Sequence, residues 1–258
     1  MPYLLEVCVD SVESAISAQK GGAHRIELCA NMVIGGTTPG IALFQEIKRH
    51  TSLKIHVLIR PRFGDFLYND YEFSCMQREV ELFCREGADG IVIGCLKEDG
   101  ELNREQMKAL IELAGGKSVT LHRAFDMCRE PFSALLQAAE LGVDTILTSG
   151  QQENCIEGMP LLRKLCLRED GRIKIMAGAG VNARAIELLT RECPGLSCFH
   201  MSGKMVLPSA MRYRREQVHM GLPGLSEYEY FKTDEKAISR AREVLELAFG
   251  NREDTAID

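Results

Sequence analysis

The chain has 258 residues, of which 45% are hydrophobic and 26% are charged, and its formal net charge at pH 7 is −6. This composition is ordinary for a globular protein, and it argues against a nucleic-acid-binding protein because no basic stretch is long enough to neutralise a row of phosphates. A membrane protein is equally disfavoured, since no apolar run reaches the ~18 residues that a bilayer-spanning helix needs.

The N-terminal stretch MPYLLEVCVDS has no basic segment followed by a long apolar core. We therefore expect no secretory signal and a cytoplasmic protein. In that compartment the ten cysteines should be reduced thiols. None of them has the C-x-x-C spacing of a redox centre or a zinc ribbon.

Short runs rich in β-forming residues alternate along the chain with amphipathic stretches of helical length, such as 11–22, 104–116 and 131–142. The predicted strands lie at 4–10, 25–30, 54–61, 90–95, 118–125, 145–150, 173–180 and 198–204. Alternating strands and helices predict parallel strands with right-handed crossovers. Eight such units in about 250 residues predict a single-domain (β/α)8 TIM barrel over 1–258. An open doubly wound sheet is the alternative, but VCVDSVES after the first strand lacks the glycines of its phosphate fingerprint.

Two segments interrupt this alternation. A long loop at 60–73 follows the third strand, and a long, mostly irregular segment at about 207–235 follows the eighth. Long loops in compact domains are often functional. The end of the chain, at about 250–258, is expected to be a frayed tail.

Side chains alternate between the two faces of a strand, so the apolar positions of each strand predict which residues point into the barrel. In the first strand Leu5, Val7 and Val9 form the apolar face, which leaves Glu6 and Cys8 pointing inward. The same test on the other strands predicts that these residues also point into the barrel: Glu27, Cys29, His56, Leu58, Arg60, Thr120, His122, His200 and Ser202.

These inward polar side chains come from five strands and form a plausible acid–base set. We expect Glu27 or His122 to act as a general base, with Asp126 orienting a neighbouring group and Glu6 as a further catalytic carboxylate. The alternative is a purely structural network of paired charges, which some barrel cores contain.

The loops after the last strands predict an anion site, because barrels often bind phosphate there. AGAGVNAR, at 177–184, places Gly178 and Gly180 between a strand and a helix N-terminus. We also expect an anion to contact Arg60, Arg62, Arg123, Ser149 and Ser202. No role is assigned to Lys204.

Cys8 and Cys29 occupy equivalent points of the first two strands, each two residues after an inward glutamate. Neighbouring strands lie ~5 Å apart, so both thiols could reach one soft ion, and two opposed thiolates suit Cu(I). Zinc usually takes four ligands, and His56 and Glu27 are the nearby residues that a zinc site would have to add. Both cysteines could instead be small apolar fillers of the core.

Several motifs resemble the CutC family of copper homeostasis proteins, in order from residue 3 to about residue 215. They are LLEVCVDSVESA, GGAHRIELCA, GGTTPG, IRPRFGDFLY, LHRAFDM, LTSG, MAGAGV and MRYR. The resemblance implies a (β/α)8 barrel, and it implies Cu(I) binding by Cys8 and Cys29, which match the cysteines to which Cu(I) binding is ascribed in animal members. The chain departs from the family pattern at Phe63, where a glycine is usual, and at HMSGK in place of H-x-S-A.

Two functions therefore remain open on the sequence. One is a copper homeostasis protein that binds Cu(I). The other is a metal-independent isomerase, lyase or hydrolase that acts on a small anionic, possibly phosphorylated, metabolite. We expect no organic cofactor in either case, and a homo-oligomeric protein.

Overall fold

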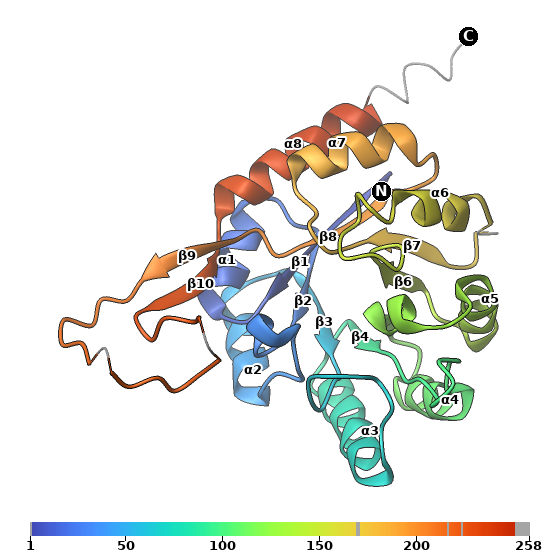
Figure 1. The fold of residues 1–258 in the computed structure, drawn as a ribbon, viewed down its shortest axis with the longest axis horizontal. Helices are drawn as coiled ribbons and strands as arrows, with labels where there is room; N and C mark the ends of the chain where they lie inside the picture. The colour runs from blue at the N-terminus through green and yellow to red at the C-terminus, as the bar shows by residue number, and fades with distance from the viewer. Residues whose placement is uncertain (1, 169–170, 216, 223, 251–258) are drawn as a thin grey trace.

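The computed structural model describes residues 2–168, 171–215, 217–222 and 224–250. Eight parallel strands form a closed barrel in sequence order, and β8 pairs with β1 to close it (Figure 1). The strands are β1 Leu4–Val9, β2 Arg25–Leu28, β3 Lys54–Leu58, β4 Gly90–Ile93, β5 Ser118–Leu121, β6 Thr145–Thr148, β7 Lys174–Ala177 and β8 Cys198–Met201. The predicted TIM barrel is confirmed.

Helices surround the barrel and connect its strands (Figure 1). They are α1 Val12–Lys20, α2 Ile41–His50, α3 Asp70–Arg85, α4 Arg104–Leu113, α5 Pro131–Leu141, α6 Met159–Arg168, α7 Ala183–Glu192 and α8 Glu235–Gly250, with short 3-10 helices η1 Met32–Ile34 and η2 Arg123–Met127. Within the described ranges, no helix combines the length and the apolar character that crossing a bilayer requires.

The strand side chains separate into an outer and an inner layer. Leu5, Val7 and Phe199 belong to the large apolar core that also contains the buried faces of the helices. A smaller group inside the barrel consists of Cys8, Cys29, Leu58 and Val92, and another of Leu147, Met176 and Cys198. The structure thus follows the alternation expected from the sequence, and the polar inward residues lie in the inner layer.

Two glycines of the fourth strand region, Gly90 and Gly94, give room to histidines from the flanking strands. A Cβ atom on Gly90 would lie 2.6 Å from the ring of His56, and one on Gly94 would lie 2.5 Å from the ring of His122. Both distances are shorter than real Cβ contacts, so any larger residue would displace a ring. The absence of side chains at Gly90 and Gly94 therefore leaves the space that the rings of His56 and His122 occupy.

Most of the described residues of the segment at about 207–235 are irregular, as expected, but two strands at its ends form an ordered ribbon. Strands β9 Lys204–Pro208 and β10 Glu229–Thr233 pair in an antiparallel ribbon that projects from the side of the barrel, which we call the arm (Figure 1). Apolar cross-strand pairs such as Phe231 opposite Val206 account for this order. The predicted frayed tail lies, from residue 251 on, outside the described residues.

Candidate functional site

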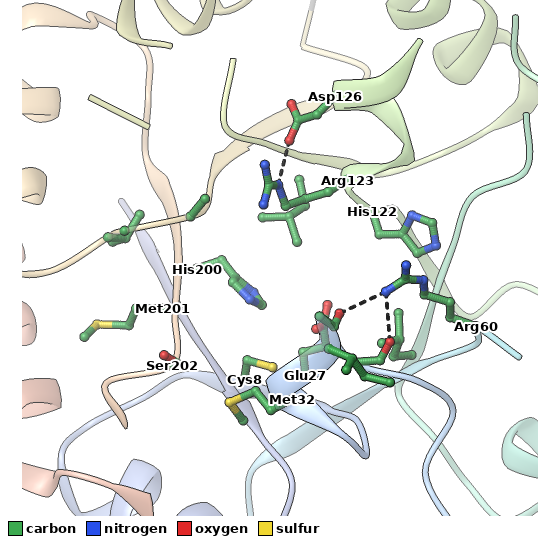
Figure 2. Close-up of a pocket in the computed structure, with 18 of the residues that line it drawn as sticks. Cys8, Glu27, Met32, Arg60, His122, Arg123, Asp126, His200, Met201 and Ser202 are labelled. Atoms are coloured by element: carbon green, nitrogen blue, oxygen red, sulfur yellow. Dashed lines mark hydrogen bonds and ion pairs between the residues drawn. The ribbon is translucent and has the colours of Figure 1, made fainter. Parts of the chain in front are cut away.

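A cavity of about 570 Å³ opens at the carboxyl ends of the barrel strands. Its wall contains residues from β1, β2, β8 and the loops that follow the strands (Figure 2). Among the lining residues are Cys8, Glu27, Met32, Arg60, His122, Arg123, Asp126, Gly180, His200 and Ser202. Polar side chains from distant parts of the sequence therefore meet at the end of the barrel where active sites of this fold occur.

Glu6 and His200 form a paired network inside the barrel. Glu6 accepts a hydrogen bond from Arg25 Nε at 2.5 Å, and its other oxygen lies 2.7 Å from Nδ1 of His200. Burial alone would raise the pKa of Glu6, but Arg25 and His200 outweigh it and hold that pKa well below its usual value. Glu6 is not part of the cavity wall, so its predicted catalytic role, which stays a prediction, would have to act through His200.

Burial by itself would lower the pKa of His200, but Glu27 and the hydrogen bonds with Cys8 and Glu6 raise it well above the usual value. Arg25, the other partner of Glu6, is a residue that the sequence analysis missed. Its position was predictable, because it shares the inward alternation of Glu27 in β2.

Cys8 and Cys29 lie side by side, with their sulfur atoms 3.5 Å apart. Cys8 lines the cavity, whereas Cys29 lies behind it and is fully buried. The hydrogen bond with Cys29 and burial raise the pKa of Cys8 well above the usual thiol value. Cys8 therefore holds its proton at neutral pH, and a metal ion that binds this thiol must displace the proton.

Met32 is a third sulfur donor that the sequence analysis missed. It packs against the cluster that contains Cys8 and Cys29, and it lines the cavity (Figure 2). Met32 belongs to η1, in the loop after β2, so strand alternation could not place it. The one indication in the sequence that Met32 lies near the thiols is its position three residues after Cys29.

Glu27 lies beside Cys8 at the floor of the cavity. A sulfur of Cys8, an oxygen of Glu27 and a nitrogen of His200 all lie within 4.8 Å of one another, the one such group found among the described residues. Burial raises the pKa of Glu27, and its Oε2 atom has no hydrogen-bond partner. Of the three predicted catalytic carboxylates, Glu6, Glu27 and Asp126, that of Glu27 is therefore the best placed to exchange a proton.

Arg60 presents a fixed positive charge at the wall of the cavity. It donates hydrogen bonds to the carbonyl oxygens of Gly36 at 3.1 Å and Gly64 at 2.8 Å, and its guanidinium lies 4.9 Å from the ring centre of Phe66. Its Nε atom has no partner. The contact of Arg60 with an anion stays a prediction.

His122 packs its ring 4.9 Å from that of Phe66. Nδ1 accepts a hydrogen bond from the backbone N–H of Ala124 at 3.1 Å, so Nε2 carries the hydrogen, and Nε2 has no partner. Burial and the charge of Arg60 lower the pKa of His122 to about 3. This neutral tautomer offers a donor rather than a free lone pair, which favours Glu27 over His122 as the predicted general base.

Asp126 joins the loops that follow β5 and β6. Its carboxylate accepts hydrogen bonds from Arg123 Nε at 2.7 Å, Thr148 Oγ1 at 2.5 Å, the backbone and side chain of Ser149, and the backbone N–H of Gln151 at 3.1 Å. Arg123 also donates to Ser149 Oγ at 2.9 Å. With its acceptors occupied in this way, Asp126 holds Arg123 in place, and the catalytic role expected for Asp126 stays a prediction.

The structure separates some predicted anion-binding residues from the cavity. Gly180, Ser202, Arg60 and Arg123 line it, but Arg62, Ser149 and Gly178 do not. Arg62 turns away to form ion pairs with Glu72 at 2.6 Å and Asp65 at 2.9 Å. Only part of the predicted anion-binding set therefore lines the cavity, and anion binding there stays a prediction.

Comparisons with known proteins agree with this fold. The model of the CutC family matches residues 3–205. A family protein CutC of Bacteroides fragilis strain YCH46 is 47% identical over 240 residues, covering 92% of this chain and 94% of the relative. The human copper homeostasis protein cutC homolog is 42% identical over 233 residues, covering 90% and 85%. The crystal structure of CutC from Streptococcus agalactiae superposes with a TM-score of 0.74 at 28% identity, covering 78% of this chain and 98% of that one.

Proposed function

The chain belongs to the CutC family, and from this membership we propose that it is a copper homeostasis protein that binds Cu(I) through Cys8 and Cys29. The observation that carries the proposal is the 3.5 Å separation of the two sulfur atoms. A soft ion with metal–sulfur bonds of about 2.3 Å can contact both sulfurs at that separation. Thiolates are the ligands that Cu(I) prefers.

The surroundings of the thiol pair fit such a cargo. Cys8 faces the cavity, which gives an ion a path from solvent, and Cys29 closes the site from behind. Met32 adds a thioether at the cavity wall as a third soft donor. Because Cys8 keeps its proton at neutral pH, Cu(I) uptake releases protons and weakens as the pH falls.

The proposal includes a cytoplasmic location. All ten cysteines are free thiols in the structure, which fits a reducing compartment. Oxidation of the thiol pair would remove both soft ligands, so the proposed function also needs that compartment.

The proposal further includes a homo-oligomer that forms through the arm. The arm exposes the apolar side chains of Met205, Val206 and Tyr230, and the segment between its two strands exposes those of Met220 and Leu222. A monomer would leave them all in water. Exposed apolar patches of this kind are typical of interaction surfaces.

A metal-independent enzyme for a small anionic metabolite is the second candidate, favoured by the charge of Arg60, which lines the cavity and whose buried Nε atom has no partner. It has less support than the copper proposal. Arg62 pairs with Glu72 and Asp65 outside the cavity, and the carboxylate of Asp126 is occupied by hydrogen bonds. Glu27 and Arg60 are the groups that such a reaction would use.

An anaerobic titration tests the copper proposal. The protein competes for Cu(I) with a colorimetric Cu(I) chelator, and the wild type is compared with the Cys8→Ser/Cys29→Ser double variant. We expect one Cu(I) per wild-type chain and none in the double variant. Cys75→Ser is the control, because Cys75 is exposed and far from the pair in the sequence. Equal copper binding by the wild type and the double variant would refute the thiol site.

A further inference from the structure

The floor of the cavity holds a second set of possible metal ligands. This set shares only Cys8 with the proposed Cu(I) site of Cys8 and Cys29. A thiol, a carboxylate and an imidazole, the three donor types of protein zinc sites, converge there from Cys8, Glu27 and His200 within 4.8 Å (Figure 2). We propose that these three residues form a site for a divalent ion of the zinc type, distinct from the Cu(I) pair in ligands and in the ion that it selects.

The distances allow this site with small movements. Zinc bonds of about 2.0–2.3 Å place tetrahedral ligand atoms roughly 3.5 Å apart, so each pair of ligand atoms, now within 4.8 Å, would have to close by no more than about 1.3 Å. The carboxylate of Glu27 supplies an independent sign of a missing ligand. Only 5% of Glu27 is exposed, yet its Oε2 atom has no partner. A buried carboxylate oxygen without a partner is costly, and a bound cation removes that cost.

The pairing of His200 with Glu6 supports the same assignment. Glu6 Oε1 holds Nδ1 of His200 at 2.7 Å, and Arg25 in turn fixes Glu6. Nε2 of His200 then faces Cys8, and an ion bound to both residues would replace the hydrogen bond between them. A metal-binding histidine typically donates its other ring N–H to a carboxylate, which orients the ring and increases its basicity. Glu6 is therefore a positioning residue of the proposed site.

Three protein ligands leave a fourth position of zinc open, as in catalytic rather than structural zinc sites. The open position faces a cavity that Arg60 and Arg123 also line. Two arginines beside an open coordination position favour an exchangeable oxyanion, such as a carboxylate or a phosphate, over a neutral ligand. The proposed site is thus a metal centre that can take a small anionic ligand directly.

The test uses the full chain, stripped of metal, and Co²⁺ as a spectroscopic substitute for Zn²⁺. We expect one Co²⁺ per chain, with thiolate-to-cobalt charge-transfer absorption and d–d bands of four-coordinate intensity, displaced by one equivalent of Zn²⁺. Cys8→Ser should abolish the charge-transfer band. Glu6 does not contact the ion but holds His200, so Glu6→Gln should lower the Co²⁺ affinity by about 10–100-fold. Glu27→Gln and His200→Gln each remove a direct ligand and should lower the Co²⁺ affinity by more than that.

The Cys29→Ser variant separates this proposal from the copper proposal. It should keep Co²⁺ and Zn²⁺ affinity within about threefold while losing Cu(I). Matched controls are Cys75→Ser, Glu46→Gln and His50→Gln, all at exposed side chains, which should bind as the wild type does. Equal loss of Co²⁺ in Cys29→Ser and Cys8→Ser, or unchanged affinity in Glu27→Gln, whose size matches glutamate, would overturn the proposal. Neither result would bear on Cu(I) binding by the thiol pair.

Discussion

Glu6 Oε1 lies 2.7 Å from Nδ1 of His200, between residues at opposite ends of the barrel sequence that the pairing of β1 with β8 brings face to face. Glu6 is fully buried, whereas 13% of the His200 side chain is exposed at the cavity. The buried carboxylate of Glu6 therefore raises the pKa of an imidazole that a ligand in the cavity can reach.

We expect Glu6→Gln to destabilise the protein by about 3 kcal/mol, because removing one partner of a buried ion pair leaves an uncompensated charge, here on Arg25. Denaturant unfolding followed by circular dichroism measures this change. Glu46→Gln is the control, since its ion pair with Arg49 is exposed and should contribute less than about 1 kcal/mol. Equal free energies of unfolding for Glu6→Gln and Glu46→Gln would show that the buried pair of Glu6 and Arg25 stabilises the protein no more than an exposed pair does.

The free energy of unfolding should decrease as the pH falls from 6.5 towards 4. Burial, with a smaller contribution from Arg25, lowers the pKa of His56 from 6.5 to about 4, so in this interval the unfolded chain binds a proton that the folded chain does not. Each such histidine gives a slope of about 1.4 kcal/mol per pH unit. His122, with a pKa of about 3, acts in the same direction.

The His56→Leu variant isolates this effect. It should reduce the slope between pH 6.5 and 4 by the contribution of one histidine, as measured by urea unfolding at several pH values. His50→Leu, at an exposed position, should leave the slope unchanged. An unchanged slope in the His56→Leu variant would contradict the lowered pKa given for His56.

Gly94→Ala should displace the ring of His122, because the new Cβ atom would lie 2.5 Å from it and 2.8 Å from Cβ of Ala124. Overpacking of this kind costs about 1–3 kcal/mol. Thermal unfolding and the NMR signal of the His122 ring would detect the change. Gly221→Ala is the control, since no atom lies within 4 Å of its added Cβ. An undisturbed His122 signal in Gly94→Ala would show that the ring has more room than the structure indicates.

Light scattering checks the proposed arm interface. A Val206→Lys/Tyr230→Lys variant places charges on two exposed apolar positions of the arm and should lower the molar mass of the oligomer. Leu247→Lys, an equally apolar and exposed position on α8, should not. A wild-type mass equal to that of one 28.8 kDa chain would contradict the oligomer itself.

Local sequence patterns determined the barrel and much of its interior. The alternation of β and helical runs predicts eight parallel strands, and the alternation of side chains within β1 and β2 correctly places Glu6, Cys8 and Glu27 inside. Both patterns depend on near-neighbour geometry, since every second residue of a strand shares a face. The order of the arm was missed because its two strands are separated by about twenty residues.

Tertiary structure alone decided which inward residues share a site. Cys8 meets Glu27 and His200 because ring closure brings β8 next to β1, while Met32 reaches the thiols from a loop whose path no periodicity predicts. The same holds for two charged residues of the loops. Arg62 lies outside the cavity because it pairs with Glu72 and Asp65. Asp126 stays in the cavity wall, but nearby partners in the loops occupy its carboxylate. Strand alternation determines the face on which a side chain lies, whereas the partners that compete for it come from distant parts of the chain and are set only when the barrel closes.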